Sequence, residues 1–258
     1  LTRSKRAKVT RPLGESLENS QWSRSFMFLS LGVAYALDQG IETVFIFENG
    51  ILSINMPVSE ARMNTRTVYP KFLDMYQNLI GQVFGAKIKV SNPFATMTKG
   101  EVAKELGDKR LRSLVRDSIS CWDYPRGVNL LASRRRVSSF QGKHCGICFP
   151  CLIRRISLYT AGLADYDDSY VVDVFGEYPN LDRNTITTMT DLVRFCDEIV
   201  RKYTKEILVG YPQFSIDVEG IDPLELVQLY KRFGEETRDC FRDLGNPRLV
   251  SDFRSLLT

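Results

Sequence analysis

The sequence lacks any apolar stretch long enough to cross a membrane. Its most hydrophobic segment, residues 25–37, is short and is interrupted by Ser30, Gly32 and Tyr35, whereas a spanning helix needs about 20 consecutive apolar residues. No signal peptide is evident either. These absences argue against an integral membrane protein and a membrane partner, and together with clustered thiols they favour a reducing cytoplasm.

A strong charge of one sign is also missing. The 258 residues carry 35 Lys and Arg against 31 Asp and Glu, a net charge of +4, and 43% of them are hydrophobic, so the chain can bury a sizeable core. The basic residues nevertheless gather before residue 12, at 110–116 and at 134–143. We interpret these clusters either as surfaces that attract phosphates or as solvated faces without a ligand.

Hairpin signals, internal repeats and low-complexity runs are absent, and helix and strand patterns alternate. Residues 21–38 predict an apolar helix, residues 43–47 a strand buried on both faces, and residues 69–85 and 87–90 a second helix and strand. Residues 98–101 match a capping box that opens a further helix. This alternation predicts an α/β fold with a doubly wound, mostly parallel sheet.

The second half of the chain has a different pattern. Residues 107–144 are polar and Arg-rich and predict a long excursion, residues 151–163 predict a helix, and the apolar spacing beyond about residue 180 predicts further helices. We therefore expect a basic irregular lead-in over 1–20, an α/β domain with a metal site over 21–178, and a helical tail over 179–258.

Four cysteines predict a metal site. Cys145, Cys148 and Cys151 form a C-x2-C-x2-C run, whose thiolates can surround one ion, and a tetrahedral sulfur site suits zinc. Cys121 is the nearest upstream thiol that can complete the set. With four protein ligands the site would be closed, and the zinc structural rather than catalytic.

Other interpretations of the cysteines remain open. An iron–sulfur cluster run would need a further cysteine at the position of Arg155, and disulfides would need an oxidising compartment. His144, the only histidine, is an alternative fourth ligand, although a simple loop residue beside the cysteines fits better. Cys196 and Cys240 lie in helical patterns and are expected to be core or half-buried thiols.

The cysteine run and its surroundings resemble a known family. Residues 120–121, 144–151, 154–155, 161–163 and 168–170 are similar to the C-terminal half of the 7-cyano-7-deazaguanine synthase family, and residues 24–32, 92–94 and 98–101 are similar to segments further upstream in it. The resemblance covers roughly residues 20–172 and implies a fold of the adenine nucleotide alpha-hydrolase superfamily.

The same resemblance implies a reaction. Members of this family use ATP and magnesium to activate 7-carboxy-7-deazaguanine as an adenylate; ammonia then forms an amide, and a second activation gives the nitrile. Zinc would hold the wall of the substrate pocket. The implied activity is that of an ATP-dependent ligase forming C–N bonds, with ATP and a deazapurine acid as its small-molecule partners.

The chain also departs from the family pattern. The Ser-Gly-Gly-x-Asp-Ser phosphate loop does not occur in these 258 residues, and we expect it, with its strand and helix, upstream of Leu1 rather than lost. Without it the chain is not expected to hydrolyse ATP alone. The gap between Cys121 and Cys145 is longer than in the biosynthetic enzymes, and residues 48–57 and 64–67 resemble a divergent branch from bacterial anti-phage gene clusters. That branch would imply a defence role and a protein partner from the same cluster.

Six residues are candidates for nucleotide contacts. Side chains at strand ends and helix starts can reach a phosphate or carboxylate, whereas a surface arginine or a plain turn without a ligand is the alternative for each of them. Asp123 and Tyr124, which follow the first zinc cysteine, are weaker candidates for reading the base. The predicted anion contacts are Arg24, Arg62, Arg66 and Lys99, and Glu48 and Asn49 are predicted to bind ribose, purine or magnesium.

Two function classes follow from these observations. The first is an ATP-dependent enzyme that acts on a deazapurine acid, with no catalytic residue assigned. The second is a zinc-stabilised nucleic-acid-binding module or an inactive scaffold, which would use the basic clusters near Arg135. Aromatic residues interleaved with basic ones would favour nucleic-acid binding, and only Phe140 is so placed, so the enzyme is favoured.

Overall fold

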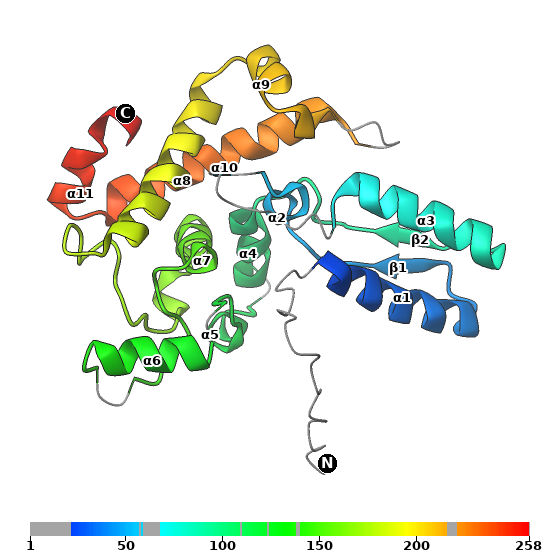
Figure 1. Ribbon diagram of the computed structural model, residues 1–258, viewed down its shortest axis with the longest axis horizontal. Coiled ribbons are helices and arrows are strands. Elements are labelled where there is room, and N and C mark those ends of the chain that lie inside the picture. The colour runs from blue at the N-terminus through cyan, green and yellow to red at the C-terminus, as the bar shows by residue number, and fades with distance from the viewer. Residues whose placement is uncertain are drawn as a thin grey trace, which may run out of the picture.

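The structure is a computed structural model, and it describes residues 22–56, 58, 68–108, 110–122, 124–137, 140–215 and 221–257. Within these ranges a small α/β unit extends from a larger helical body, as the right-hand and left-hand sides of Figure 1 show. No helix in the described ranges combines the length and the apolar character that a membrane-spanning segment requires.

The α/β unit contains two parallel strands and two long helices. Helix α1 (Trp22–Gln39) leads to strand β1 (Thr43–Phe45), and helix α3 (Pro70–Phe84) leads to strand β2 (Lys89–Ser91). The strands pair in parallel, with Val44 opposite Val90. Helix α3 ends where the sequence predicts, because Gly85 adopts a φ of 66° and its N–H bonds to the carbonyl of Gly81.

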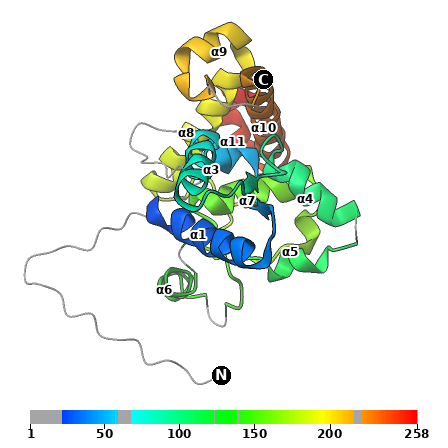
Figure 2. The ribbon, with the colours of Figure 1, turned by 90° about the vertical axis from the view of Figure 1, so that its right-hand side faces the viewer.

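Both helices cover the same face of this sheet. Phe26 of α1 lies edge-on to Tyr76 of α3, with ring centroids 5.5 Å apart, and Val44 and Val90 join the apolar cluster that the two helices share. Figure 2 shows α1 and α3 next to each other on this side. One face of the two strands is therefore packed against helices.

The opposite face carries exposed aromatic residues. Side chains alternate between the faces of a strand, so Phe45 points away from the face that holds Val44, and it is 57% exposed. Phe47, two residues on, is 66% exposed and contacts Phe94. Helix α1 also exposes a run of large apolar side chains: Phe26, Met27, Phe28, Leu31 and Tyr35.

Two predictions are corrected by this arrangement. The parallel pairing is confirmed, but the doubly wound sheet is not, because the described residues form only two strands with helices on one face. The expected burial of residues 43–47 on both faces is wrong, since Phe45 and Phe47 are exposed. A continuous apolar run shows that a strand can be covered on both faces, whereas the covering elements have to come from elsewhere in the tertiary structure.

Two short segments continue the chain beyond the carboxyl ends of the strands. Helix α2 (Gly50–Ile54) follows β1, and helix α4 (Lys99–Asp108) follows β2. The predicted capping box is confirmed: the Thr98 N–H donates to Glu101 Oε2 at 2.7 Å, and the Glu101 N–H donates to Thr98 Oγ1 at 3.0 Å.

The helical body begins with the polar, Arg-rich segment that precedes the cysteine run. Residues 107–144 contain two short helices, α5 (Ser113–Asp117) and α6 (Arg126–Arg134), and lead into α7 (Phe149–Thr160). The predicted helix over residues 151–163 is thus confirmed, beginning two residues earlier and ending just before Gly162, whose φ is 65°. A 3-10 turn, η1 (Ala164–Tyr166), follows it.

Beyond residue 182 most of the described residues are helical, as the apolar spacing predicts. Asp182 caps α8 by accepting from the Thr185 N–H at 3.0 Å, and Asp222 caps α10 by accepting from the Leu224 N–H at 2.8 Å. The two helices cross closely at Gly234, where an added Cβ would lie 2.6 Å from Val200. The elements here are α8 (Arg183–Arg201), α9 (Thr204–Gly210), η2 (Pro212–Phe214), α10 (Pro223–Leu244), α11 (Pro247–Asp252) and α12 (Arg254–Leu257).

One apolar cluster joins these helices to the cysteine region. Cys145 and Cys151 belong to the same buried cluster as Met189 of α8 and Phe241 of α10. The boundary proposed at residues 178–179 remains a prediction, and the lead-in over residues 1–20 lies outside the described residues.

Candidate functional site

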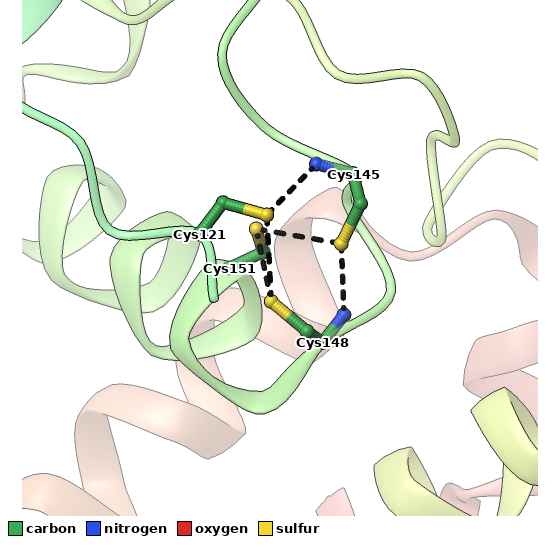
Figure 3. A group of neighbouring side chains, drawn as sticks. All are labelled: Cys121, Cys145, Cys148 and Cys151. Carbon is green, nitrogen blue, oxygen red and sulfur yellow. Dashed lines mark hydrogen bonds between the residues drawn. The ribbon is translucent and has the colours of Figure 1, made fainter. Parts of the chain in front are cut away.

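The four predicted metal cysteines come together around the start of α7 (Figure 3). Cys121 lies in the loop after α5, Cys145 and Cys148 lie in the loop before α7, and Cys151 lies in its first turn. The loop needs Gly146, because its φ is 87° and a Cβ there would lie 2.0 Å from the carbonyl oxygen of Val172. The local sequence therefore bends the chain so that three thiols face Cys121.

The geometry of these thiols fits a zinc ion. Sulfurs held tetrahedrally at about 2.3 Å from one zinc lie about 3.8 Å from one another. The Sγ atoms of Cys145 and Cys151 are 3.9 Å apart, those of Cys148 and Cys121 3.9 Å, and those of Cys148 and Cys151 3.4 Å. All four lie within 4.8 Å of one another. The donor set is the closed, all-sulfur kind that structural zinc prefers.

Backbone N–H groups and neighbouring thiols form hydrogen bonds with these sulfurs. The Cys145 N–H donates to Cys121 Sγ and the Cys148 N–H donates to Cys145 Sγ, both at 3.4 Å. Hydrogen bonds from the other thiols lower the pKa of Cys121, and the bond from Cys145 has the largest effect. The pKa of Cys151 is raised, mainly by its hydrogen bond with Cys121. The thiols thus do not ionise independently of one another, and a cation at this position would favour the thiolate form of all four.

His144 is placed beside this cluster and has another role. Its Nε2 accepts a hydrogen bond from the Ser120 N–H at 3.4 Å, and burial lowers the pKa of His144, which keeps the ring a neutral acceptor. Its side chain is not among the four groups that surround the candidate metal position. The arrangement thus brings Cys121 rather than His144 next to the other three thiols.

Arg154 fixes the loop that carries Cys121. This side chain is 4% exposed and donates to Asp167 Oδ1 at 2.9 Å, to Ser118 Oγ at 2.8 Å and to the Val115 carbonyl at 2.5 Å. Since Arg154 lies on α7 and Ser118 lies after α5, the bonds tie the two sides of the cysteine cluster together. A buried arginine held by this many partners is costly to disrupt.

A polar cluster lies at the carboxyl ends of the two parallel strands, where open α/β sheets bind ligands. We call Glu48, Asn49, Asn92, Lys99 and Ser120 the strand-end cluster. Asn92 Nδ2 donates to the Glu48 carbonyl at 2.8 Å, and the Glu48 N–H donates to Asn92 Oδ1 at 3.3 Å. These two bonds join the ends of β1 and β2 and hold the Glu48 backbone in place.

Lys99 connects the strand-end cluster to the cysteine cluster. It is the first residue of α4, and its Nζ donates to Ser120 Oγ at 3.4 Å. Ser120 precedes Cys121, and its Oγ also accepts from Arg154 Nη1 at 3.4 Å. A zinc ion held by Cys121 would therefore also hold the hydroxyl that contacts Lys99.

The two charges of the strand-end cluster influence each other. Burial lowers the pKa of Lys99, while the charge of Glu48 raises it and that of Arg154 lowers it. Burial also raises the pKa of Glu48, against the opposing effect of Lys99. Within the described residues Lys99 forms no ion pair closer than 4.0 Å. A partly desolvated cation of this kind can bind an anionic ligand strongly.

The structure gives less support to the other residues predicted to contact the nucleotide. The Asn49 side chain is used within the protein: its Oδ1 caps α2 by accepting from the Leu52 N–H at 3.2 Å, and its Nδ2 donates to Glu48 Oε1 at 2.9 Å. Tyr124 is 41% exposed, and no contact with the strand-end cluster is found for it in the described ranges. The side chains of Arg24, Arg62, Arg66 and Asp123 lie outside the described residues.

Some residues of this region were not predicted as site residues. Ser120 and Asn92 belong to segments that resemble the family, so the sequence did contain a signal for them. Glu236 of α10 carried none: it accepts the Thr98 hydroxyl at 2.5 Å, although 138 positions separate the two residues. Only the fold brings that carboxyl to the start of α4.

Comparison with known proteins places this arrangement in a family. A family model described as queuosine biosynthesis protein QueC matches residues 19–162, more than half of the chain. The chain belongs to the QueC family. The match includes the strand-end cluster and all four cysteines, and the predicted family resemblance is confirmed.

Individual relatives agree with the family assignment. The QueC-family chain is 28% identical over 148 residues to a 7-cyano-7-deazaguanine synthase of Rhizorhabdus wittichii, covering 55% of this chain and 54% of that protein. It is 30% identical over 149 residues to the synthase of Erythrobacter litoralis, covering 55% and 52%. The chain spans about half the length of the curated relatives that it matches. No solved structure matches it significantly.

Proposed function

We propose that this QueC-family chain forms the zinc-stabilised substrate part of an ATP-dependent enzyme that activates a 7-deazapurine carboxylate. The supporting observation is Lys99, a partly desolvated cation beside Glu48 at the carboxyl ends of two parallel strands and in contact with the loop that carries Cys121. The curated relatives bear the name 7-cyano-7-deazaguanine synthase, and a carboxylate or phosphate is the ligand that such a cation selects.

The proposed reaction forms an acyl adenylate. A carboxylate oxygen of the substrate attacks the α-phosphorus of ATP, and pyrophosphate leaves with the electron pair of the broken P–O bond. Ammonia or another amine then attacks the acyl carbon, loses a proton and displaces AMP, giving an amide. When ammonia is the amine, the oxygen of this primary amide attacks a second ATP and releases pyrophosphate, and loss of AMP and of both N–H protons then gives a nitrile. Because adenylation provides a good leaving group, the protein has mainly to position the reactants.

We assign roles to two residues of the strand-end cluster. Lys99 pairs with the negative charge of the substrate carboxylate or of the α-phosphate during the attack. Glu48, whose pKa burial raises, accepts the proton that the attacking amine loses, because a base works best when its pKa is near the working pH. Magnesium, when bound, would neutralise the triphosphate charge.

Zinc has a positional role in this proposal. The four cysteines hold the loop of residues 118–121 against α7, and Ser120 in that loop contacts Lys99. The zinc site is closed by four thiolates, so the metal would hold the wall of the pocket without touching the reacting atoms.

We also propose that the phosphate-binding strand, loop and helix are supplied by a polypeptide segment outside these 258 residues. The exposed face around Phe45 and Phe47 supports this idea, because it is the kind of apolar sheet surface that a helix or further strand covers. A role in anti-phage defence, with a protein partner from the same gene cluster, is retained as the more specific form of the proposal.

An exchange assay tests the proposed activity. The native full-length polypeptide, loaded with zinc, is incubated with ATP, magnesium, labelled pyrophosphate and 7-carboxy-7-deazaguanine. We expect exchange that depends on the acid, and we expect Lys99→Met to reduce it by about 10²-fold, as when one charge-stabilising group is removed. Lys104→Met, an exposed lysine on the same helix, is the matched control and should exchange normally. No exchange by the wild type would reject the proposal.

A nucleic-acid-binding role is supported by one observation. Trp122 follows Cys121 and is 71% exposed, and an exposed indole can stack on a base. Titration with single-stranded oligonucleotides, followed by tryptophan fluorescence at several salt concentrations, tests this alternative. Quenching that Trp122→Phe abolishes and that salt weakens would support it.

A further inference from the structure

Helix α10 lies outside the family-matched residues and yet contacts both loops of the strand-end cluster. The family model ends at residue 162, whereas α10 spans Pro223–Leu244. In Figure 1 this helix passes behind α8 and reaches the junction where α2 and α4 begin. The longest helix of the tail is therefore in contact with the region that we assign to substrate binding.

The first contact is with the loop after β1. The Tyr230 hydroxyl donates to the Ile51 carbonyl at 2.9 Å and accepts from the Met56 N–H at 3.1 Å, so one buried side chain bonds to the first turn of α2 and to the segment just after it. Leu229 lies so close to Gly50 that a Cβ there would be 2.5 Å from its Cδ2. The position of α2, which directly follows Glu48 and Asn49, thus depends on α10.

The second contact is with the loop after β2. Arg232 Nε donates to Glu101 Oε1 at 2.7 Å, and its Nη2 donates to the Thr96 carbonyl at 2.8 Å. Glu236 accepts the Thr98 hydroxyl at 2.5 Å. Thr98 and Glu101 are the two members of the capping box that starts α4, and Lys99 lies between them. Two polar side chains of α10, Arg232 and Glu236, therefore hold both ends of the turn that carries Lys99.

We propose that Glu236 is a positioning residue for the strand-end cluster, because its hydrogen bond with Thr98 fixes where α4 begins and so where the Lys99 ammonium lies. This inference rests on the proposed function for its catalytic meaning, although the positional claim concerns Lys99 alone. Glu236 touches neither the strand-end cluster nor the cysteine cluster directly. Its effect passes through Thr98, which is fully buried, and through the first turn of α4.

Substitutions can distinguish the hydrogen bond between Thr98 and Glu236 from the charge of the Glu236 carboxylate. Thr98 needs an acceptor oxygen, which a glutamine amide also provides, so Glu236→Gln should keep the position of Lys99, whereas Glu236→Ala should lose it. Glu235, the adjacent and exposed residue on α10, offers a matched control in Glu235→Ala. Thr98→Val removes the same bond from the other side and serves if Glu236→Ala does not fold.

Lysine acetylation measured by peptide mass spectrometry tests the positional claim without any assay of turnover. The rate at Lys99 is compared with that at the exposed Lys104 in the same protein, under conditions where thermal unfolding shows every variant to be folded. We expect Glu236→Ala, or Thr98→Val, to raise the relative rate at Lys99 about fivefold, the change that loss of one hydrogen bond makes in a local opening equilibrium. Glu236→Gln and Glu235→Ala should match the wild type.

The exchange assay on the full-length polypeptide then provides the functional measurement. Glu236→Ala should lower kcat at least tenfold with the KM for ATP nearly unchanged, and Glu236→Gln should restore it, because a small displacement of a reacting group is costly. Wild-type labelling of Lys99 in both Glu236→Ala and Thr98→Val would overturn the inference, as would a change in Glu236→Gln equal to that in Glu236→Ala. A wild type without exchange would reject the proposed function and leave the labelling result to decide the positional claim.

Discussion

At the scale of single residues, the most unusual groups are charged side chains that are partly withdrawn from water. Lys99, Glu48 and Glu236 lie within one region, and burial shifts the pKa of each toward the neutral form. Perturbed groups of this kind gather at functional sites more often than elsewhere, although structural networks also produce them. Lys99 and Glu48 belong to the strand-end cluster, whereas Glu236 acts on it from outside.

We predict that Glu236 makes stability depend on pH. Burial raises the pKa of Glu236 from its ordinary 4.5 to about 7, so between these values the folded protein binds more protons than the unfolded chain. The free energy of unfolding should then fall as pH rises through this window, by at most about 1.4 kcal/mol per pH unit from this group. The stabilising contribution is fully present below pH 4.5 and is lost above about pH 7.

Denaturant unfolding of Glu236→Gln at several pH values checks this prediction. Glutamine does not titrate, so the variant should gain stability relative to the wild type as pH rises from 5 to 8. Glu235→Gln, at the exposed neighbouring position, should show no such trend. A stability difference between Glu236→Gln and the wild type that is the same at pH 5 and pH 8 would contradict the assigned pKa.

At the scale of elements, the cysteine loop and α7 form one unit whose four thiols could hold a metal ion. Gly146 allows the turn, Arg154 joins α7 to the loop after α5, and the four thiols close around a single position. Thiols this close are poorly arranged for one another without a cation, because they cannot all ionise. Metal binding is therefore expected to stabilise the folded state directly.

We predict that Cys148→Ser loses the zinc while Cys240→Ser keeps it. Cys148 lies in the cluster, whereas Cys240 is equally free of disulfides but buried in α10. Elemental analysis after dialysis should find one zinc per chain in the wild type and in Cys240→Ser, and well under one in Cys148→Ser. Thermal unfolding with and without a chelator should show a lower Tm for the chelated wild type. Full zinc occupancy in Cys148→Ser would mean that the four thiols are not the ligands.

At the scale of the whole molecule, one face of the sheet in the α/β unit is left exposed, whereas the helices of the helical body pack around a shared core. The tail helices share one buried core with the cysteine region, whereas the sheet has one face covered by α1 and α3 and exposes Phe45 and Phe47 on the other. Exposed apolar patches on a monomer usually mark an interaction surface. This face is where we expect the segment carrying the phosphate loop to bind.

We predict that these 258 residues alone bind a hydrophobic dye through this face. The fluorescence of anilinonaphthalene sulfonate should rise with the folded chain, and the double variant Phe45→Lys, Phe47→Lys should reduce the signal by at least half. Val209→Lys, which replaces a side chain that is 78% exposed on α9, should leave it unchanged. Dye binding that survives the double variant would place the apolar surface elsewhere.

Much of the local structure could be predicted, because short-range rules control it. Helix α3 ends at Gly85 and α4 begins with Thr98 and Glu101, since a left-handed residue and a capping box depend only on neighbouring positions. The extent of the sheet could not be predicted from the run at residues 43–47. Burial on both faces requires partners distant in sequence, and these are missing from the described residues.

The spacing of Cys145, Cys148 and Cys151 by itself determined that three thiols face one point, because a two-residue gap and Gly146 leave the chain little choice. That spacing, with the residues around it, was also enough to indicate the family. Only the tertiary structure decided that Cys121 rather than His144 lies among the other three thiols, that Asn49 caps a helix, and that Glu236 contacts Thr98. These contacts join elements that are distant in the sequence, and the packing of their side chains in the folded protein determines which residues lie together.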